Sequence, residues 1–243
     1  MSRGVLMACA AGAIGLSGCS STKDKAAEFV DEGSKAFEAK GLAVGKVNVS
    51  VKVEDAQVIR DGSGTAAVVV LRSRAQTALE DVPLALDVAD GSGKSIWKND
   101  TAGLQDSLVS VPVLAPGAKT TWINDQVLPD AGTAAAVKAR VGKAKAAPAA
   151  LPKLSVSAPR LEGDPVDGVA ARGELVNDSK VEQKDLVVYG LARKGGKVVA
   201  AGRAVVPRVR AGAKARYAIF FIGNPRGAKL DVSVPPTTLR SAG

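Results

Sequence analysis

The chain contains no histidine, so its two cysteines are the most reactive side chains that could do chemistry. Cys9 lies inside an apolar N-terminal stretch, and Cys19 follows Leu16-Ser17-Gly18 at the end of that stretch. The stretch comes after a single positive charge, Arg3, and is too short to span a bilayer as a mature helix. A positive start, an apolar run and a small-residue end are the pattern of a secretory signal peptide.

Leu16-Ser17-Gly18-Cys19 resembles the lipobox of bacterial lipoproteins. The resemblance implies that residues 1–18 are cleaved as a lipoprotein signal peptide and that the thiol of Cys19 takes a diacylglycerol. Acyl chains such as palmitate would then anchor the protein to a membrane of the cell envelope, on a periplasmic or outward-facing side. The alternative is a plain signal peptide that happens to end in Ser-Gly-Cys.

The missing histidine also limits the catalytic sites that this chain could build. Histidine is the usual general base near neutral pH and the commonest metal ligand, so serine triads and ordinary zinc sites are excluded. A mature chain with Cys19 acylated has no free thiol and no disulfide. Carboxylate pairs and Ser-Lys dyads remain as a distant alternative, and we expect a protein that is not an enzyme and holds neither cofactor nor metal.

Three local groupings could still be taken for binding sites. The segment Gly91-Ser92-Gly93-Lys94-Ser95 is similar to the tail of a phosphate-binding loop, but the glycine required five positions before Gly93 is replaced by Val88. A hairpin turn is the simpler interpretation. The acidic groupings do not have the spacing of a calcium loop, and solvated loop acids explain them better. These groupings are Asp87 with Asp90, and Asp61 with Glu54 and Asp55.

Most of the remaining chain alternates with a period of two, which predicts short antiparallel strands separated by Gly, Pro, Asp and Ser turns. In the first half the predicted strands cover 47–53, 65–71, 82–89, 94–98, 108–114, 119–127 and 134–141. In the second half they cover 154–161, 168–176, 186–192, 197–206, 214–222 and 229–234. The predicted fold class is therefore all-β, with two immunoglobulin-like antiparallel β-sandwich domains preceded by a short helix.

That helix is predicted at residues 23–40, with Thr22 or Asp24 as its cap and Gly41 after its end. It would either lie on the membrane surface beside the lipid or pack on the next domain. The predicted domains are the acylated tether and helix (19–43), a first sandwich (44–141), an Ala/Pro/Lys linker (142–152) and a second sandwich (153–243).

The two halves repeat each other. Residues 114–122 align with residues 209–217, each with a glycine turn followed by Ala-Lys and an aromatic residue five positions after the glycine. Asp81 aligns with Asp185, and the first half has an extra loop at 99–107. Two unrelated β domains with similar turns remain the alternative.

The second half is similar to the FxLyD-type immunoglobulin-like domains of bacterial surface and periplasmic lipoproteins. The match rests on Gly173-Glu174-Leu175-Val176-Asn177-Asp178-Ser179, then Tyr189-Gly190-Leu191-Ala192, then Gly196-Lys197 and Val209-Arg210-Ala211-Gly212. It departs at Arg193, where the family has Asp, and the first half lacks the aromatic positions. The resemblance implies the fold and a general binding or spacer role, with no catalytic residues to transfer.

The two halves differ in net charge. Residues 153–243 carry 16 Lys and Arg against 8 Asp and Glu, whereas residues 44–141 carry 10 against 11. Arg208, Arg210, Lys214 and Arg216 are predicted to form a basic patch on the exposed face of adjacent strands, which Arg226 and Lys229 could extend.

We expect this patch to contact an acidic envelope polymer or envelope protein, in a membrane-anchored binding or assembly module. Nucleic acid is not an expected partner. The alternative is a structural spacer or envelope-stability protein whose basic face is only solvated.

Overall fold

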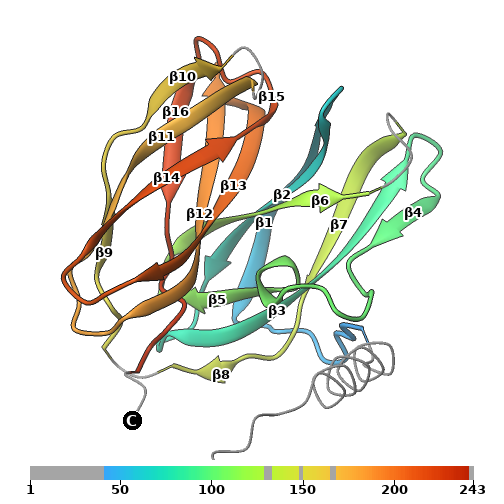
Figure 1. Ribbon diagram of the computed structural model, residues 1–243. Coiled ribbons are helices and arrows are strands. Elements are labelled where there is room, and N and C mark those ends of the chain that lie inside the picture. Colours follow the sequence, from blue (N-terminus) through green and yellow to red (C-terminus); the bar gives the residue numbers. More distant parts are fainter. Residues whose placement is uncertain (1–40, 129–132, 148–149, 165–167, 241–243) are drawn as a thin grey trace, which may run out of the picture. The chain divides into compact units, whose positions relative to one another are not determined.

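The computed structural model describes residues 41–128, 133–147, 150–164 and 168–240. These residues fold into antiparallel β-sheets with a single turn of 3-10 helix, η1 (Asp106–Leu108), so the predicted all-β class is confirmed (Figure 1). Cys19 and the predicted helix at 23–40 lie outside the described residues.

The first half forms two sheets. In the β2 sheet, β2 (Gly64–Ser73) lies between β1 (Val51–Asp61) and β6 (Lys119–Val127). In the β3 sheet, β3 (Leu79–Asp90) pairs on one side with β4 (Ser95–Lys98) and β5 (Ser110–Leu114). It also pairs with β7 (Ala134–Val141) and the short β8 (Lys145–Ala146).

The second half also forms two sheets. In the β12 sheet the order is β15 (Ile222–Gly223), β13 (Lys197–Val209), β12 (Gln183–Lys194) and β16 (Lys229–Ser233). In the β11 sheet, β11 (Gly168–Asn177) pairs on one side with β10 (Arg160–Asp164) and β9 (Leu154–Val156), and on the other with β14 (Lys214–Phe220).

The central part of strand β12 is buried on both of its faces. Leu186 and Val188 belong to the core shared with the β11 sheet, whereas Val187, Tyr189 and Leu191 pack into the core of the first half. Strand β2 is equally enclosed, since every residue from 66 to 71 is at most 3% exposed. Residues from the β12 and β2 sheets meet in one apolar core, so the two sandwiches pack against each other through these sheets.

Two of the differences between the observed and the predicted strand boundaries have clear local reasons. The first strand begins at Val51 and not at Val47, because Asn48 accepts a hydrogen bond of 2.9 Å from the N–H of Ser50 and forms a turn there. The predicted strand at 154–161 is divided into β9 and β10, with Pro159 between them. Proline has no N–H to contribute to a strand ladder.

The segment predicted as a linker begins with paired backbone. Residues Lys145 and Ala146 form β8 against β3, and the N–H of Ala147 donates to the carbonyl of Ala78 at 2.8 Å. The side chain of Lys145 lies 3.6 Å from Asp81. This part of the 142–152 segment is therefore held against the first sandwich.

The two halves share backbone features at the positions that align in sequence. Asp81 and Asp185 have positive φ angles of 50° and 48°, and they are the two described residues other than glycine that do. Each interrupts the pairing of a long central strand, β3 or β12, with its neighbour.

The turns at Gly117 and Gly212 also correspond, with φ angles of 65° and 69°. In the first half the strand that would match β13 is divided into β4 and β5 by the loop predicted at 99–107. Buried Asn99 fills the break by hydrogen bonding to the backbone of Leu84, Leu86 and Leu108.

Candidate functional site

The four predicted basic residues are all exposed and lie around one turn of the second half. Arg208 is near the end of β13, Arg210 is in the turn, and Lys214 and Arg216 are on β14. Val209, between Arg208 and Arg210, is 2% exposed, and Tyr217, directly after Arg216, is 4% exposed. The predicted alternation of outward charges with inward apolar residues is therefore present.

The predicted placement on adjacent paired strands is wrong. β13 belongs to the β12 sheet and β14 belongs to the β11 sheet, so the chain crosses from one layer of the sandwich to the other at Gly212. Arg208 pairs across its own sheet with Lys184, whereas Lys214 and Arg216 pair across theirs with Val176 and Glu174. The basic residues lie at one end of the sandwich and not on one flat face. We call Arg208, Arg210, Lys214 and Arg216 the basic end.

The turn of the basic end is held by Asn177, whose side chain is fully buried. Its amide nitrogen donates to the carbonyls of Val181, Val209 and Arg210 at 2.9, 3.2 and 3.1 Å. The N–H of Gly212 donates to the Asn177 carbonyl at 2.9 Å. The Asn of the family-like motif therefore connects the 177–181 loop to the Gly212 turn.

The glycine of the same motif has a packing role. Gly173 lies opposite Tyr217 in the β11–β14 ladder, and a Cβ atom at position 173 would collide with the tyrosine ring. Burial raises the pKa of Tyr217, whose hydroxyl donates to the Ser157 carbonyl at 3.4 Å. These motif residues stabilise the fold, and the exposed charges nearby are the groups available to a partner.

The four cations of the basic end differ in whether they already form an ion pair within the protein. Arg208 lies 2.8 Å from Glu182, and its hydrogen bond holds the pKa of Glu182 below the ordinary value of a glutamate. Arg216 faces Glu174 across the ladder without an ion pair. Neither Arg210 nor Lys214 makes an ion pair with a carboxylate of the described residues.

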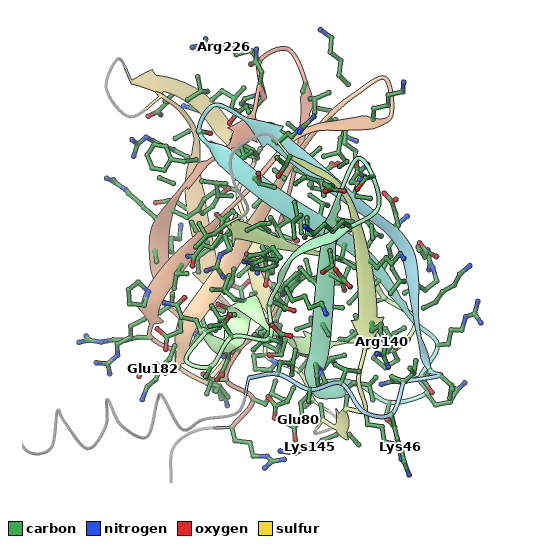
Figure 2. All side chains as sticks on the ribbon, turned by 90° about the vertical axis from the view of Figure 1, so that its right-hand side faces the viewer. Lys46, Glu80, Arg140, Lys145, Glu182 and Arg226 are labelled. Atoms are coloured by element: carbon green, nitrogen blue, oxygen red, sulfur yellow. The ribbon has the colours of Figure 1, made fainter. Side chains whose placement is uncertain are left out.

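Two lysines of this region were not predicted, and the two predicted extensions, Arg226 and Lys229, do not belong to it. Lys180 is exposed in the loop that Asn177 holds, and Lys184 is the ladder partner of Arg208. The Asn-Asp-Ser turn before Lys180 was the signal that could have found it. Arg226 does not extend the patch: Figure 2 shows it at the end of the second half opposite to Glu182, the partner of Arg208. Lys229 pairs in the strand ladder with Arg193, at the end of β12 opposite to Lys184.

Figure 2 also labels Lys46, Glu80, Arg140 and Lys145 in the lower part of the first half, with Lys145 next to Glu80. Lys145 is the ladder partner of Glu80, and Arg140 donates to the carbonyl of Val44 at 3.5 Å. Lys145 and Arg140 therefore each have a partner within the first half.

The other candidate groupings are structural. The Gly91–Ser95 segment is the β3–β4 hairpin turn, in which Asp90 accepts hydrogen bonds from Ser92 and Lys94. Glu54 pairs with Arg72 at 2.6 Å and Lys119 at 3.2 Å. Asp61 accepts the N–H of Gly223 at 2.6 Å. The described residues contain no group of three or more His, Cys, Asp or Glu that could hold a metal.

A buried ion pair between the halves also escaped sequence analysis. Arg203 on β13 lies 2.9 Å from Asp125 on β6 and donates a second hydrogen bond of 2.9 Å to Ser107. Tyr189, its ladder partner, is 1% exposed, and burial raises its pKa. Tyr189, together with Leu191, also lines an apolar cavity of 310 Å³ between the halves.

The two charged residues of this cavity, Lys119 and Asp231, already pair with Glu54 and Arg193. The cavity therefore presents no unpaired charge to a ligand.

In the part of the chain that the structure describes, no helix is long and apolar enough to cross a membrane. No protein-family model matches this sequence, and no curated protein sequence matches it significantly.

Proposed function

We propose that this protein is a membrane-anchored envelope lipoprotein that acts as a non-enzymatic binding or assembly module, with its basic end contacting an acidic partner. The observation that carries this proposal is the pair Arg210 and Lys214. Both are exposed beside the buried Asn177, and neither forms an ion pair with a carboxylate of the described residues. A fixed turn with unpaired cations suits electrostatic recognition, because the backbone that carries the charges is already ordered before a partner arrives.

The membrane-anchored part of the proposal rests on Leu16-Ser17-Gly18-Cys19. An acyl group on Cys19 would hold the sandwiches on the extracytoplasmic side of a membrane. Two further observations support an immunoglobulin-like identity and a tandem repeat. The halves have the same positive-φ aspartates, Asp81 and Asp185, and the same glycine turns, Gly117 and Gly212.

The runner-up function, a structural spacer, is favoured by a different observation. The two sandwiches share one apolar core and the buried Arg203–Asp125 pair, which suits a protein that holds a fixed distance. In that case the cations of the basic end would serve solubility and would shield the edge of a sheet.

A polyanion-binding experiment separates these functions. Inorganic polyphosphate is titrated into the protein at several salt concentrations, and the result is compared with the variant in which Arg208, Arg210, Lys214 and Arg216 are replaced by Gln. We expect the variant to bind more weakly and with a smaller salt dependence, because fewer counterions are displaced by its remaining charges. Thermal stability should change little, since all four side chains are exposed.

A matched control removes four exposed lysines elsewhere: Lys46, Lys98, Lys138 and Lys143, each replaced by Gln. This variant loses the same formal charge and should retain most of its affinity for polyphosphate. Equal losses in both variants would show that net charge alone drives binding and would favour the spacer.

A further inference from the structure

The strand β14 lies at an open edge of its sheet. It hydrogen bonds with β11 on one side, and no other described strand pairs with it. An edge strand presents unpaired N–H and C=O groups, and an extended segment of another chain can add to them as a new strand. The backbone of β14 before Phe220 is therefore a docking surface that the side chains around it can make selective. The carbonyl of Phe220 itself lies close to Gly202 of β13.

The outward side chains of β14 change from charged to apolar along the strand. Lys214 and Arg216 are exposed, Ala218 is half-buried, and Phe220 is 44% exposed, whereas Tyr217 and Ile219 between them are buried. Because side chains alternate along a strand, the four outward residues share one face. One end of this edge is cationic and the other is apolar.

Within the described part of the chain, the other edge strands of the second half carry fewer unpaired cations: β10 has one, Arg160, and β16 has one, Lys229, whereas β14 has two. On β10, Glu162 pairs with Arg172 at 3.2 Å, and on β16, Asp231 pairs with Arg193 at 3.6 Å. The two cations of β14 have no ion pair among the described residues, although Glu174 lies opposite Arg216. Two unpaired cations on one face of an open edge strand therefore occur together on β14.

We propose that an extended acidic segment of a partner protein adds to the free edge of β14 as an antiparallel strand. Its carboxylates lie opposite Lys214 and Arg216, and an apolar side chain lies opposite Phe220. This inference rests on the function proposed above and specifies the partner of the same basic end. A peptide fits the edge better than a phosphate polymer, because only a peptide backbone offers matching N–H and C=O groups at strand spacing.

The probe is the synthetic peptide LTATETE, which in antiparallel register places Leu opposite Phe220 and its two Glu opposite Arg216 and Lys214. We expect saturable binding. Replacing both Lys214 and Arg216 with Gln should weaken it about tenfold. In the matched variant, Arg208 and Arg210 are replaced by Gln, which removes the same charge away from the β14 edge. This variant should lose less affinity for LTATETE. The isomer LATTTEE puts its carboxylates on opposite faces and should bind more weakly than LTATETE.

The decisive test uses two N-methylated forms of the peptide, with methyl groups on alternate amides in one frame or the other. Strand addition uses the N–H groups of one frame alone, so one form should lose binding and the other should keep it. Equal binding of both forms overturns the inference, because charge attraction alone is then sufficient. Formation of a homodimer that LTATETE does not dissociate would also overturn it, since a second copy would then occupy the edge.

The outcomes separate the two proposals. If polyphosphate binding depends on the basic end while N-methylation has no effect, the proposed function stands and strand addition fails. If neither polyphosphate nor LTATETE binds, both proposals fail. A last variant, Phe220→Ser, changes an exposed side chain and should remove the affinity difference between LTATETE and the same peptide with Ser in place of Leu. An unchanged difference would show that Phe220 is not part of the surface.

Discussion

The guanidinium of Arg203, on β13 of the second half, donates a hydrogen bond of 2.9 Å to the carboxylate of Asp125 on β6 of the first half. Only 3% of the arginine side chain is exposed, against 21% of the aspartate side chain. Ser107 accepts a further hydrogen bond from the same guanidinium. A charge this deeply buried needs its partner in place, so the ion pair fixes how the two sandwiches meet.

Replacing Arg203 with Ala should destabilise the protein by on the order of 3 kcal/mol, because Asp125 is left without its partner in a largely apolar interface. Chemical denaturation of the purified protein measures this change. The double variant Arg203→Met with Asp125→Leu should recover much of the lost stability, since no unpaired charge remains.

The matched control is Arg208→Met, which breaks the exposed pair with Glu182. It should change the stability little, because exposed ion pairs contribute little. Equal effects of the Arg203 and Arg208 substitutions would contradict the role given to the buried pair.

Asn177→Ala should destabilise the protein by about 2 kcal/mol, because three backbone carbonyls lose the amide that bonds to them. It should also weaken polyphosphate binding, since Arg210 then no longer lies beside an ordered turn. Thermal unfolding and the binding titration measure the two effects. Asn224→Ala, at an exposed turn, is the control and should remain within about 0.5 kcal/mol of the parent protein.

Asp61 should contribute to stability in a pH-dependent way. Burial alone would raise the pKa of its carboxyl, but hydrogen bonds from Ser63 and from the Gly223 N–H lower it below its usual value of 3.8. The folded-state pKa is thus below the unfolded one, so the carboxylate stabilises the fold above about pH 3.8, and this stability is lost as the pH falls through the folded-state pKa.

Asp61→Asn should therefore lower the melting temperature at neutral pH, with a difference from the parent that shrinks as the pH falls toward 2 to 3. Ser63→Ala removes one of the hydrogen-bond donors to Asp61, and its melting temperature should lie between those of the parent and Asp61→Asn. A difference in melting temperature that stays constant across this pH range would contradict the stabilising role of the Asp61 carboxylate.

Cys19→Ala should release the protein from the membrane, because the expected lipid attachment at this thiol is the only anchor that the sequence predicts. Cell fractionation followed by a high-salt wash measures the change. The quadruple Gln variant of the basic end is the useful comparison, since it should stay with the membrane. A Cys19→Ala protein that remains in the washed membrane fraction would show that the lipobox interpretation is wrong.

The sequence alone determined the all-β class and most of the strands. Regular alternation placed β6, β7 and β11 almost residue for residue, because an antiparallel strand with distinct faces leaves that pattern. The equivalence of the Gly117 and Gly212 turns was also visible, since a turn that needs a positive φ angle selects glycine. The outward direction of the basic residues followed from the same alternation.

Two apolar runs in the sequence also indicate how the halves pack. Residues 66–71 and 186–192 are continuous apolar runs, where a strand with one wet face would alternate. Such a run is typical of a strand covered on both faces. It could have predicted that β2 and β12 lie inside the protein and that the halves share a core.

Only the tertiary structure decided which sheets the predicted strands join. Arg208 and Lys214 are six positions apart in sequence, yet the chain changes sheets between them, and the period of a strand is the same in either sheet. The Arg203–Asp125 pair joins residues 78 positions apart, and nothing local to either residue predicts its partner. Alternation specifies the face on which a side chain lies, whereas long-range pairing determines what that face meets.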